Sequence, residues 1–143
     1  MHNRHQRPRP PIDCGPAPFV VDLARVARQN TNFRTTLWTG PHLQLTVMSI
    51  QPGEDIGLEQ HNHLDQLLRI EDGIGLVMMG SRPERLNRQT VSSGHAVIVP
   101  AGTWHNIVNL GTRPLRVSSI YAPPNHPHGT VHSTKAIAEE QGD

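Results

Sequence analysis

The segment between Gly94 and Asn109 constrains the fold more than any other part of the chain. Its fixed positions follow the spacing G-x5-P-x-G-x2-H-x3-N. The apolar residues before Pro100 form a run short enough for a buried strand, and Pro100 then removes the backbone donor that further pairing needs. Gly102 permits a tight bend, so we expect His105 to open the next strand, where a rigid backbone suits a metal ligand.

This spacing resembles the second of the two sequence motifs of the cupin superfamily and matches it at every fixed position. The resemblance extends over residues 44–121. It implies an all-β fold, the double-stranded β-helix, which is a jelly-roll barrel, with His105 as a metal ligand inside it. No internal repeat is visible, so a single barrel is expected.

The first cupin motif, G-x5-H-x-H-x3–4-E-x6-G, is matched less well, over Gly57–Gly73. His61 and His63 form the H-x-H pair, and on a strand both side chains would point to the same face. Gln66 replaces the glutamate, and only two residues separate it from His63. The resemblance implies that His61, His63, Gln66 and His105 hold one divalent transition metal. Imidazole accepts Mn, Fe, Ni and Zn, so the ion is not specified.

Several alternatives to this ligand set follow from the shortened spacing. A glutamine ligand brings no charge, which would make the ion a stronger Lewis acid but bind it less tightly. Asp65 or Glu59 could take the place of Gln66, or the histidines alone could hold the metal. Glu59 is expected on the same strand face as His61, which makes it a candidate general base. The alternative is that Glu59 is an ordinary surface carboxylate at the end of a strand.

Composition argues against several functional classes. The 143 residues suit one domain with a real core. A formal net charge of +1 gives no broad field for nucleic acid, and 3% aromatic residues offer no stacking platform for single strands. Neither a signal peptide nor an apolar run of about 20 residues is visible, so no membrane partner is expected. The single cysteine, Cys14, fits a reducing compartment, which predicts a cytoplasmic location.

Three segments are predicted: a disordered, basic and proline-rich tail (1–18), the cupin barrel (19–124) and a C-terminal tail with a short helix (125–143). A short amphipathic helix over Val21–Gln29, capped by Asp22, precedes the strands. A second, weaker helical pattern covers Ser133–Gln141. Alternation and turn residues predict strands at 35–39, 42–50, 56–61, 66–70, 74–79, 86–91, 95–99, 105–109 and 115–121.

The segment 122–132 contains three histidines, His126, His128 and His132, together with three prolines and a glycine. They could form a second metal site. Proline and glycine disfavour regular structure there, which favours a surface segment that wraps the barrel or a partner subunit.

Cupins include dioxygenases, oxalate decarboxylases, sugar isomerases and epimerases, sensor domains and storage proteins, so the resemblance does not select a reaction. We predict a metal-dependent enzyme that acts on a small oxygen-rich substrate, either isomerase-like or dioxygenase-like. The alternative is a non-catalytic cupin that binds or senses a small ligand or metal, although no DNA-binding motif accompanies the barrel. A homodimer is also expected, because the strand at Thr35–Thr39 would cover an exposed sheet edge.

Overall fold

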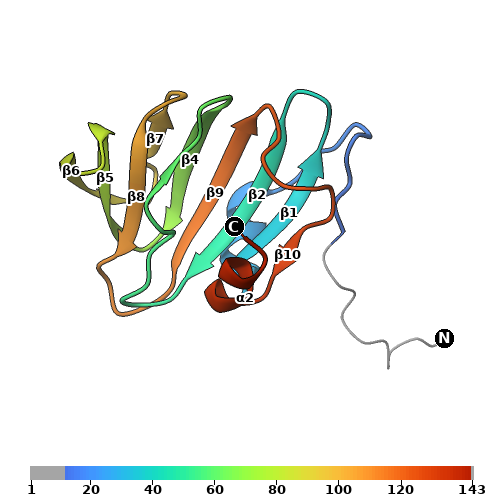
Figure 1. The fold of residues 1–143 in the computed structure, drawn as a ribbon. Coiled ribbons are helices and arrows are strands. Elements are labelled where there is room, and N and C mark those ends of the chain that lie inside the picture. Colours follow the sequence, from blue (N-terminus) through green and yellow to red (C-terminus); the bar gives the residue numbers. More distant parts are fainter. Residues whose placement is uncertain (1–11, 143) are drawn as a thin grey trace.

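The computed structural model describes residues 12–142, which form two facing antiparallel sheets (Figure 1). One sheet has the strand order β10-β1-β2-β9-β4-β7 and the other has the order β3-β8-β5-β6. The all-β prediction and the double-stranded β-helix are confirmed. The elements are α1 (Leu23–Gln29), β1 (Arg34–Thr39), β2 (Gln44–Ile50), β3 (Glu59–Gln60), β4 (Asp65–Asp72), β5 (Ile74–Arg82), β6 (Arg85–Ser92), β7 (Ala96–Val99), β8 (Trp104–Asn109), β9 (Leu115–Ala122), β10 (Val131–His132) and α2 (Lys135–Glu140).

The barrel interior changes from polar to apolar along its axis. Cross-strand partners share a face of a sheet, and Gln44, Tyr121 and Gln66 lie side by side on β2, β9 and β4. Further along the same strands, Met48 and Ile70 belong to a core cluster that also contains residues of the facing sheet. The polar end therefore holds the groups that can bind a ligand, and the apolar end holds the barrel together.

Strand β2 shows which face of an alternating strand points inward. Its more apolar face, with Leu45 and Val47, packs against α1, where Ala27 is fully buried. Because α1 covers this outer face, the face that carries Gln44 and Thr46 lines the barrel. The helix itself begins as expected, with the Asp22 side chain accepting a hydrogen bond from the Arg25 amide.

Strand β3 is much shorter than expected. Glu59 and Gln60 form a ladder with β8, Asp55 joins β8 only by an isolated bridge to Val108, and residues 61–64 form a bend. Here the chain leaves the β3 sheet and crosses to β4 in the other sheet, and the His61 carbonyl accepts a hydrogen bond from the Gly102 amide at 2.8 Å. The expectation that His61 and His63 share one face of a strand is therefore wrong.

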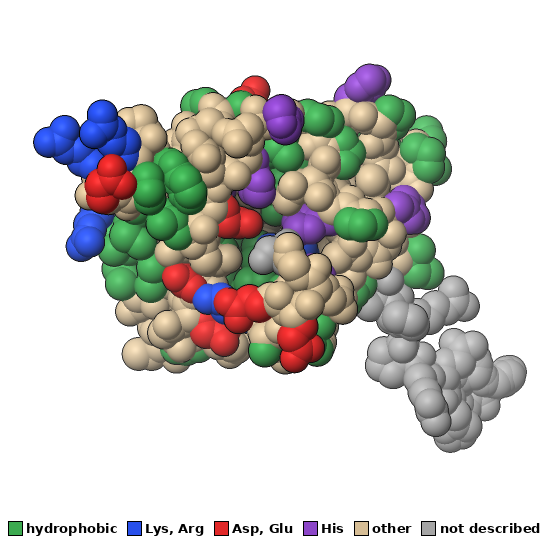
Figure 2. Space-filling view, viewed as in Figure 1, with side chains coloured by type: hydrophobic (Ala, Val, Ile, Leu, Met, Phe, Trp, Pro, Cys, Tyr) green, Lys and Arg blue, Asp and Glu red, His purple; other side chains and the backbone are tan. Residues whose placement is uncertain are grey.

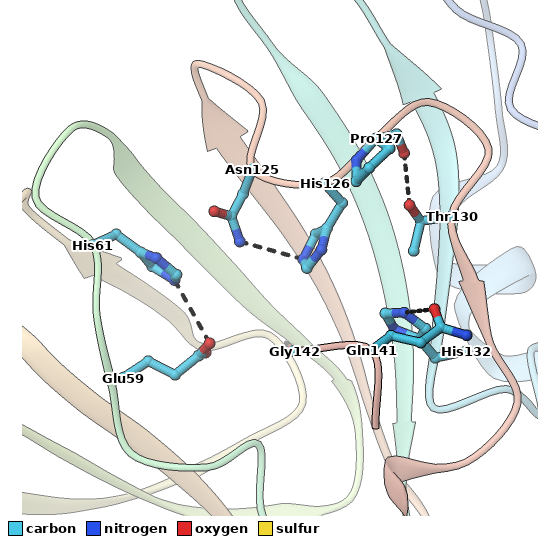
Figure 3. Close-up of a pocket in the computed structure, with 9 residues that line it drawn as sticks. All are labelled: Glu59, His61, Asn125, His126, Pro127, Thr130, His132, Gln141 and Gly142. Atoms are coloured by element: carbon cyan, nitrogen blue, oxygen red, sulfur yellow. Dashed lines mark hydrogen bonds and ion pairs between the residues drawn. The ribbon is translucent and has the colours of Figure 1, made fainter. Parts of the chain in front are cut away.

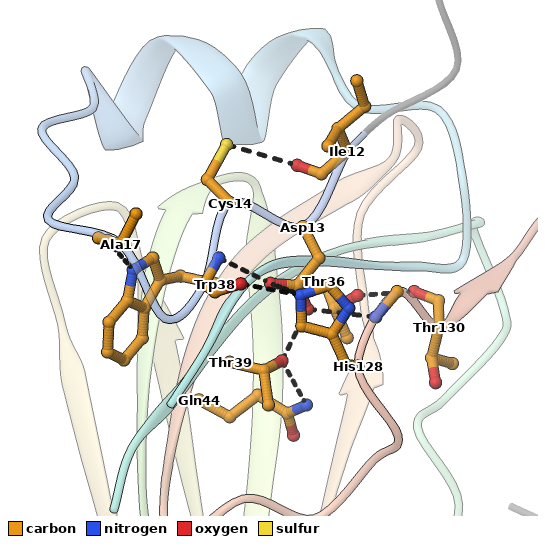
Figure 4. A network of polar contacts seen from close by, with 12 residues as sticks. Ile12, Asp13, Cys14, Ala17, Thr36, Trp38, Thr39, Gln44, His128 and Thr130 are labelled. Atoms are coloured by element: carbon orange, nitrogen blue, oxygen red, sulfur yellow. Dashed lines mark hydrogen bonds and ion pairs between the residues drawn. The ribbon is translucent and has the colours of Figure 1, made fainter. Parts of the chain in front are cut away.

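The N-terminal segment is held on the barrel wherever it is described. Residues 1–11 lie outside the described residues, but residues 12–18 pack beside β1, so the prediction of disorder is wrong for them. The buried Asp13 carboxylate accepts hydrogen bonds from the Thr39 hydroxyl and from two backbone amides, and it lies 3.2 Å from His128 Nε2 (Figure 4). Burial would raise the pKa of Asp13, but these hydrogen bonds and His128 lower it overall.

The C-terminal tail returns to the same sheet. In β10, Val131 pairs with Thr35 and His132 with Arg34, and α2 follows with Thr134 as its N-cap in place of Ser133. Part of the β1 edge is thus paired with the chain's own tail. The homodimer, which is expected because the strand at Thr35–Thr39 would cover an exposed sheet edge, stays a prediction. Neither helix in the described part of the chain is long or apolar enough to cross a membrane.

Candidate metal centre

His105 occupies a position on β8 that suits a candidate metal ligand. It pairs with Glu59 on one side and Met79 on the other, and it is 1% exposed. Its Nδ1 lies 3.1 Å from the Thr103 carbonyl oxygen, which can only accept, so Nδ1 carries the proton and Nε2 keeps a lone pair. Nε2 is buried and has no hydrogen-bond partner among the described residues. Burial lowers the pKa of His105, and the Thr103 hydrogen bond opposes this only in part, which favours the neutral, ligating form.

Glu59 and His61 meet His105 at the polar end of the barrel. The ligand atoms of the three residues all lie within 4.8 Å of one another. Metal–ligand bonds of about 2.0–2.2 Å place two ligands of one ion no more than about 4.4 Å apart, so small side-chain movements suffice for binding. His61 Nε2 lies 3.9 Å from a Glu59 carboxylate oxygen, and the His61 and His105 ring centroids are 5.5 Å apart. The donor set and its spacing fit a divalent ion.

Gln66 lies on β4, in the facing sheet, and has an unusual side-chain oxygen. It is 3% exposed, and its Nε2 donates a hydrogen bond to the Ser119 hydroxyl at 2.9 Å. Its Oε1 is buried without a hydrogen-bond partner in the described part of the chain. A buried carbonyl oxygen that has no donor is costly, and a metal would offset that cost. Its role as a ligand stays a prediction.

The structure does not bring His63 or Asp65 to this group. His63 is exposed in the bend after β3, for the reason given above. Asp65 is also exposed, and its carboxylate accepts a hydrogen bond from the Ala101 amide at 2.9 Å, which fixes the turn before β8. Of the alternatives that the sequence left open, the geometry favours Glu59 as the carboxylate beside the histidines.

Two members of the three-residue group line a cavity of about 420 Å³. Glu59 and His61 line one side, and tail residues, among them His126 and His132, line the other (Figure 3). From outside, histidine and carboxylate side chains surround a hollow on this face (Figure 2).

Two of the three tail histidines are therefore not on the surface. His126 and His132 are 9% and 3% exposed, so the expectation of a surface segment is wrong for them, whereas His128 is exposed as expected. A strand of two residues, such as β10, has no periodicity that the sequence could reveal. Burial of these side chains depends on pairing with β1, which lies far away in the sequence.

Comparisons with known proteins agree with this architecture. The cupin domain model matches residues 46–121. The uncharacterized protein YrkC of Bacillus subtilis is 59% identical over 127 residues, which are 88% of this chain and 68% of YrkC. The crystal structure of BH2720 from Bacillus halodurans is also 59% identical, with a TM-score of 0.89 over 90% of this chain and 98% of that chain.

A more distant structure, KdgF from Halomonas sp., shares the fold alone. It is 22% identical, with a TM-score of 0.58 over 64% of this chain and 80% of that chain. Cupins commonly bind a divalent metal, which agrees with the donor set described above. The extent of the matched domain and the similarity to these relatives together show that this chain belongs to the cupin family.

Proposed function

We propose that this cupin is a mononuclear metal enzyme that acts on a small, oxygen-rich substrate bound in the adjoining cavity. Glu59, His61 and His105 hold the divalent ion, and Gln66 Oε1 is a further ligand. The observation that carries the proposal is the convergence of three ligand atoms within 4.8 Å at the edge of a cavity. A set of two histidines and one carboxylate leaves coordination positions open and is typical of non-haem Fe(II) oxygenases.

The protein's own groups each have a defined task in this centre. The Thr103 carbonyl keeps the proton of His105 on Nδ1, which directs the lone pair of Nε2 to the ion. Glu59 supplies negative charge that tightens binding of a dication. The bound ion supplies Lewis-acid activation of a chelating substrate and, as iron, a redox couple.

Oxygen-dependent chemistry fits this arrangement better than isomerisation. An isomerase needs a general base beside the metal, and Glu59 was the candidate suggested by the sequence. A carboxylate that is bound to the ion is a poor proton acceptor. Glu59 is also the only carboxylate among the described residues that line the cavity. The lining histidines other than His61, which are His126 and His132, lie on its opposite side. We therefore favour the dioxygenase-like branch.

The first experiment measures metal content and affinity of protein purified without a histidine tag, by elemental analysis and competition with a chelator. Glu59→Gln and His105→Ala should each weaken binding by more than about tenfold, because each removes a ligand. Asp65→Asn and His63→Ala are matched controls and should bind metal like the wild type. Equal losses for His63→Ala and His105→Ala would instead support the ligand set implied by the H-x-H motif.

A second experiment tests the reaction class. Iron-loaded protein is mixed with hydroxy acids, keto acids and sugar phosphates, while dissolved oxygen is recorded with an electrode and products are followed by NMR. Oxygen consumption that is lost in Glu59→Gln supports the proposal. Turnover of a sugar phosphate without oxygen consumption would contradict the oxygenase assignment.

A further inference from the structure

The segment that carries Glu59 already runs beside β8 before β3 begins. Asp55 forms a bridge to Val108, with backbone hydrogen bonds of 2.9 and 3.1 Å on either side of the bridge. Further along, Glu59 pairs with His105. Three residues of the segment therefore lie opposite only two residues of β8 between these two pairs. The segment has one residue more than its partner, as in a β-bulge.

The extra residue decides which way Glu59 points. Asp55 shares a face of the sheet with Val108 and with Asn106, whose Nδ2 donates to Asp55 Oδ2 at 2.9 Å. Glu59 shares the opposite face with His105, because His105 and Asn106 are neighbours on one strand. Residues four apart on a regular strand point the same way. Without the extra residue, Glu59 would therefore point away from the metal centre.

Gly57 has the backbone conformation that this irregularity requires. Its φ is 93°, and apart from its chain neighbours no described heavy atom lies within 4 Å of the position that a Cβ would take. A side chain at this position would meet no clash, so its cost would come from the backbone alone. Gly53 precedes Asp55 and has the same two properties, with a φ of 80°. Two glycines with comparable strain on substitution thus lie on the two sides of Asp55.

Asp55 is fixed from two directions on the face that is turned away from the metal centre. Asn106 binds it from β8, and Lys135 Nζ of α2 forms an ion pair with Asp55 Oδ1. Burial raises the pKa of Asp55, but the hydrogen bonds from Asn106 and Lys135 and the charge of Lys135 lower it overall, so the carboxylate is ionised at neutral pH. Through this ion pair, α2 holds the segment that leads to Glu59.

We propose that Asp55 and Gly57 are positioning residues for the metal ligand Glu59, and that Lys135 couples the C-terminal helix to the metal affinity of the centre. The inference rests on the proposed function, because it takes Glu59 as a ligand of the ion. Asp55 fixes the start of the segment, and the irregularity at Gly57 turns the Glu59 carboxylate toward His61 (Figure 3). Asp55, Gly57 and Lys135 themselves belong neither to the ligand group nor to the cavity lining.

The first test measures the cobalt(II) affinity of tag-free protein by competition with a chelator, together with the visible absorption bands of bound cobalt(II), which report its ligand geometry. Gly57→Ala should weaken binding by about tenfold or more and alter these bands, because residues that orient a ligand contribute on that scale. Gly57→Asn should recover much of the loss, since asparagine tolerates a positive φ. Gly53→Ala is the matched control, with comparable strain before Asp55, and should bind cobalt(II) like the wild type. Unchanged affinity in Gly57→Ala would overturn the inference.

Lys135→Met separates positioning from a simple effect of charge. If Lys135 acted only through its field, removal of this cation would tighten the binding of a dication. Positioning predicts the opposite sign, a loss of about threefold, which is the scale of a partly exposed ion pair. Lys135→Arg keeps the charge and a donor for Asp55 and should retain the wild-type affinity. Tighter or unchanged binding in Lys135→Met would overturn the coupling to α2.

Failure of the proposed function would be seen separately, because the wild type would then bind no cobalt(II). Hydrogen exchange of the metal-free proteins still tests the positioning, since β3 pairs with β8 through two residues and should separate easily. The amides of β3 should exchange faster than in the wild type in Gly57→Ala and Lys135→Met, but not in Gly53→Ala. Thermal unfolding verifies that each variant is folded. Wild-type exchange of β3 in both Gly57→Ala and Lys135→Met would overturn the inference.

Discussion

Replacement of Gln44 by leucine would test how the tail is attached to the barrel. Leucine has a similar volume and tolerates burial, but it can neither donate to the His126 carbonyl nor accept from the amides of Asn125 and His126. The change therefore removes the polar contacts of one side chain and leaves most of the packing in place.

The expected loss of stability follows from the groups left without partners. Each buried donor or acceptor that loses its partner costs about 1–3 kcal/mol. Three backbone groups are affected, but the tail can leave the barrel and recover hydrogen bonds from water, which limits the total. We expect Gln44→Leu to lose roughly 2–4 kcal/mol of unfolding free energy and to unfold at a temperature lower by roughly 6–15 °C.

Hydrogen exchange measured by mass spectrometry would show where the loss arises. The amides of Asn125 and His126, and those of β10, should exchange faster in Gln44→Leu. Gln66→Leu is the matched control. It also removes a buried glutamine from the barrel interior, in the same cross-strand row, but the Gln66 side-chain amide donates to Ser119 and not to the tail. It should lower stability without faster exchange in the tail. Wild-type exchange rates at Asn125 and His126 in Gln44→Leu would refute the reasoning.

Two further predictions concern pH. Burial lowers the pKa of His105 from the usual 6.5. The contribution of His105 to the stability of the metal-free protein is therefore present above pH 6.5 and is lost as the pH falls below that value. The unfolding free energy should fall by up to about 1.4 kcal/mol per pH unit. Thermal unfolding between pH 7.5 and about 5 should show this slope in the wild type and a flatter one in His105→Asn; parallel slopes would contradict it. Asp13→Asn should destabilise the protein by about 1–3 kcal/mol at pH 7. Because the pKa of Asp13 is lowered from 3.8, the difference from the wild type should narrow as the pH falls below that value, and a constant difference in thermal unfolding would refute the role of the charge.

Local spacing in the sequence determined one candidate ligand and most of the strands. Gly94 and Gly102 both adopt a positive φ, at 94° and 86°, as the bends around the predicted strand at 95–99 require. The spacing from Pro100 leaves room for one tight turn, and β8 begins at Trp104, so His105 is the second residue of the strand and not its first. These features depend only on residues that lie a few positions apart in the chain, so a linear sequence motif can predict them.

Only the tertiary structure decided the rest of the centre and its cavity. Glu59 joins His105 because β3 pairs with β8 for two residues and then leaves the sheet, which also removes His63 from the site. Alternation in β2 indicates two faces, but the packing of α1 decides that Gln44 points inward. His126 lines the cavity because the Gln44 side chain, far away in the sequence, binds the backbone of His126. Contacts between residues far apart in the sequence leave no local sequence pattern. Each partner of such a contact places no constraint on the residues that neighbour the other partner in the chain.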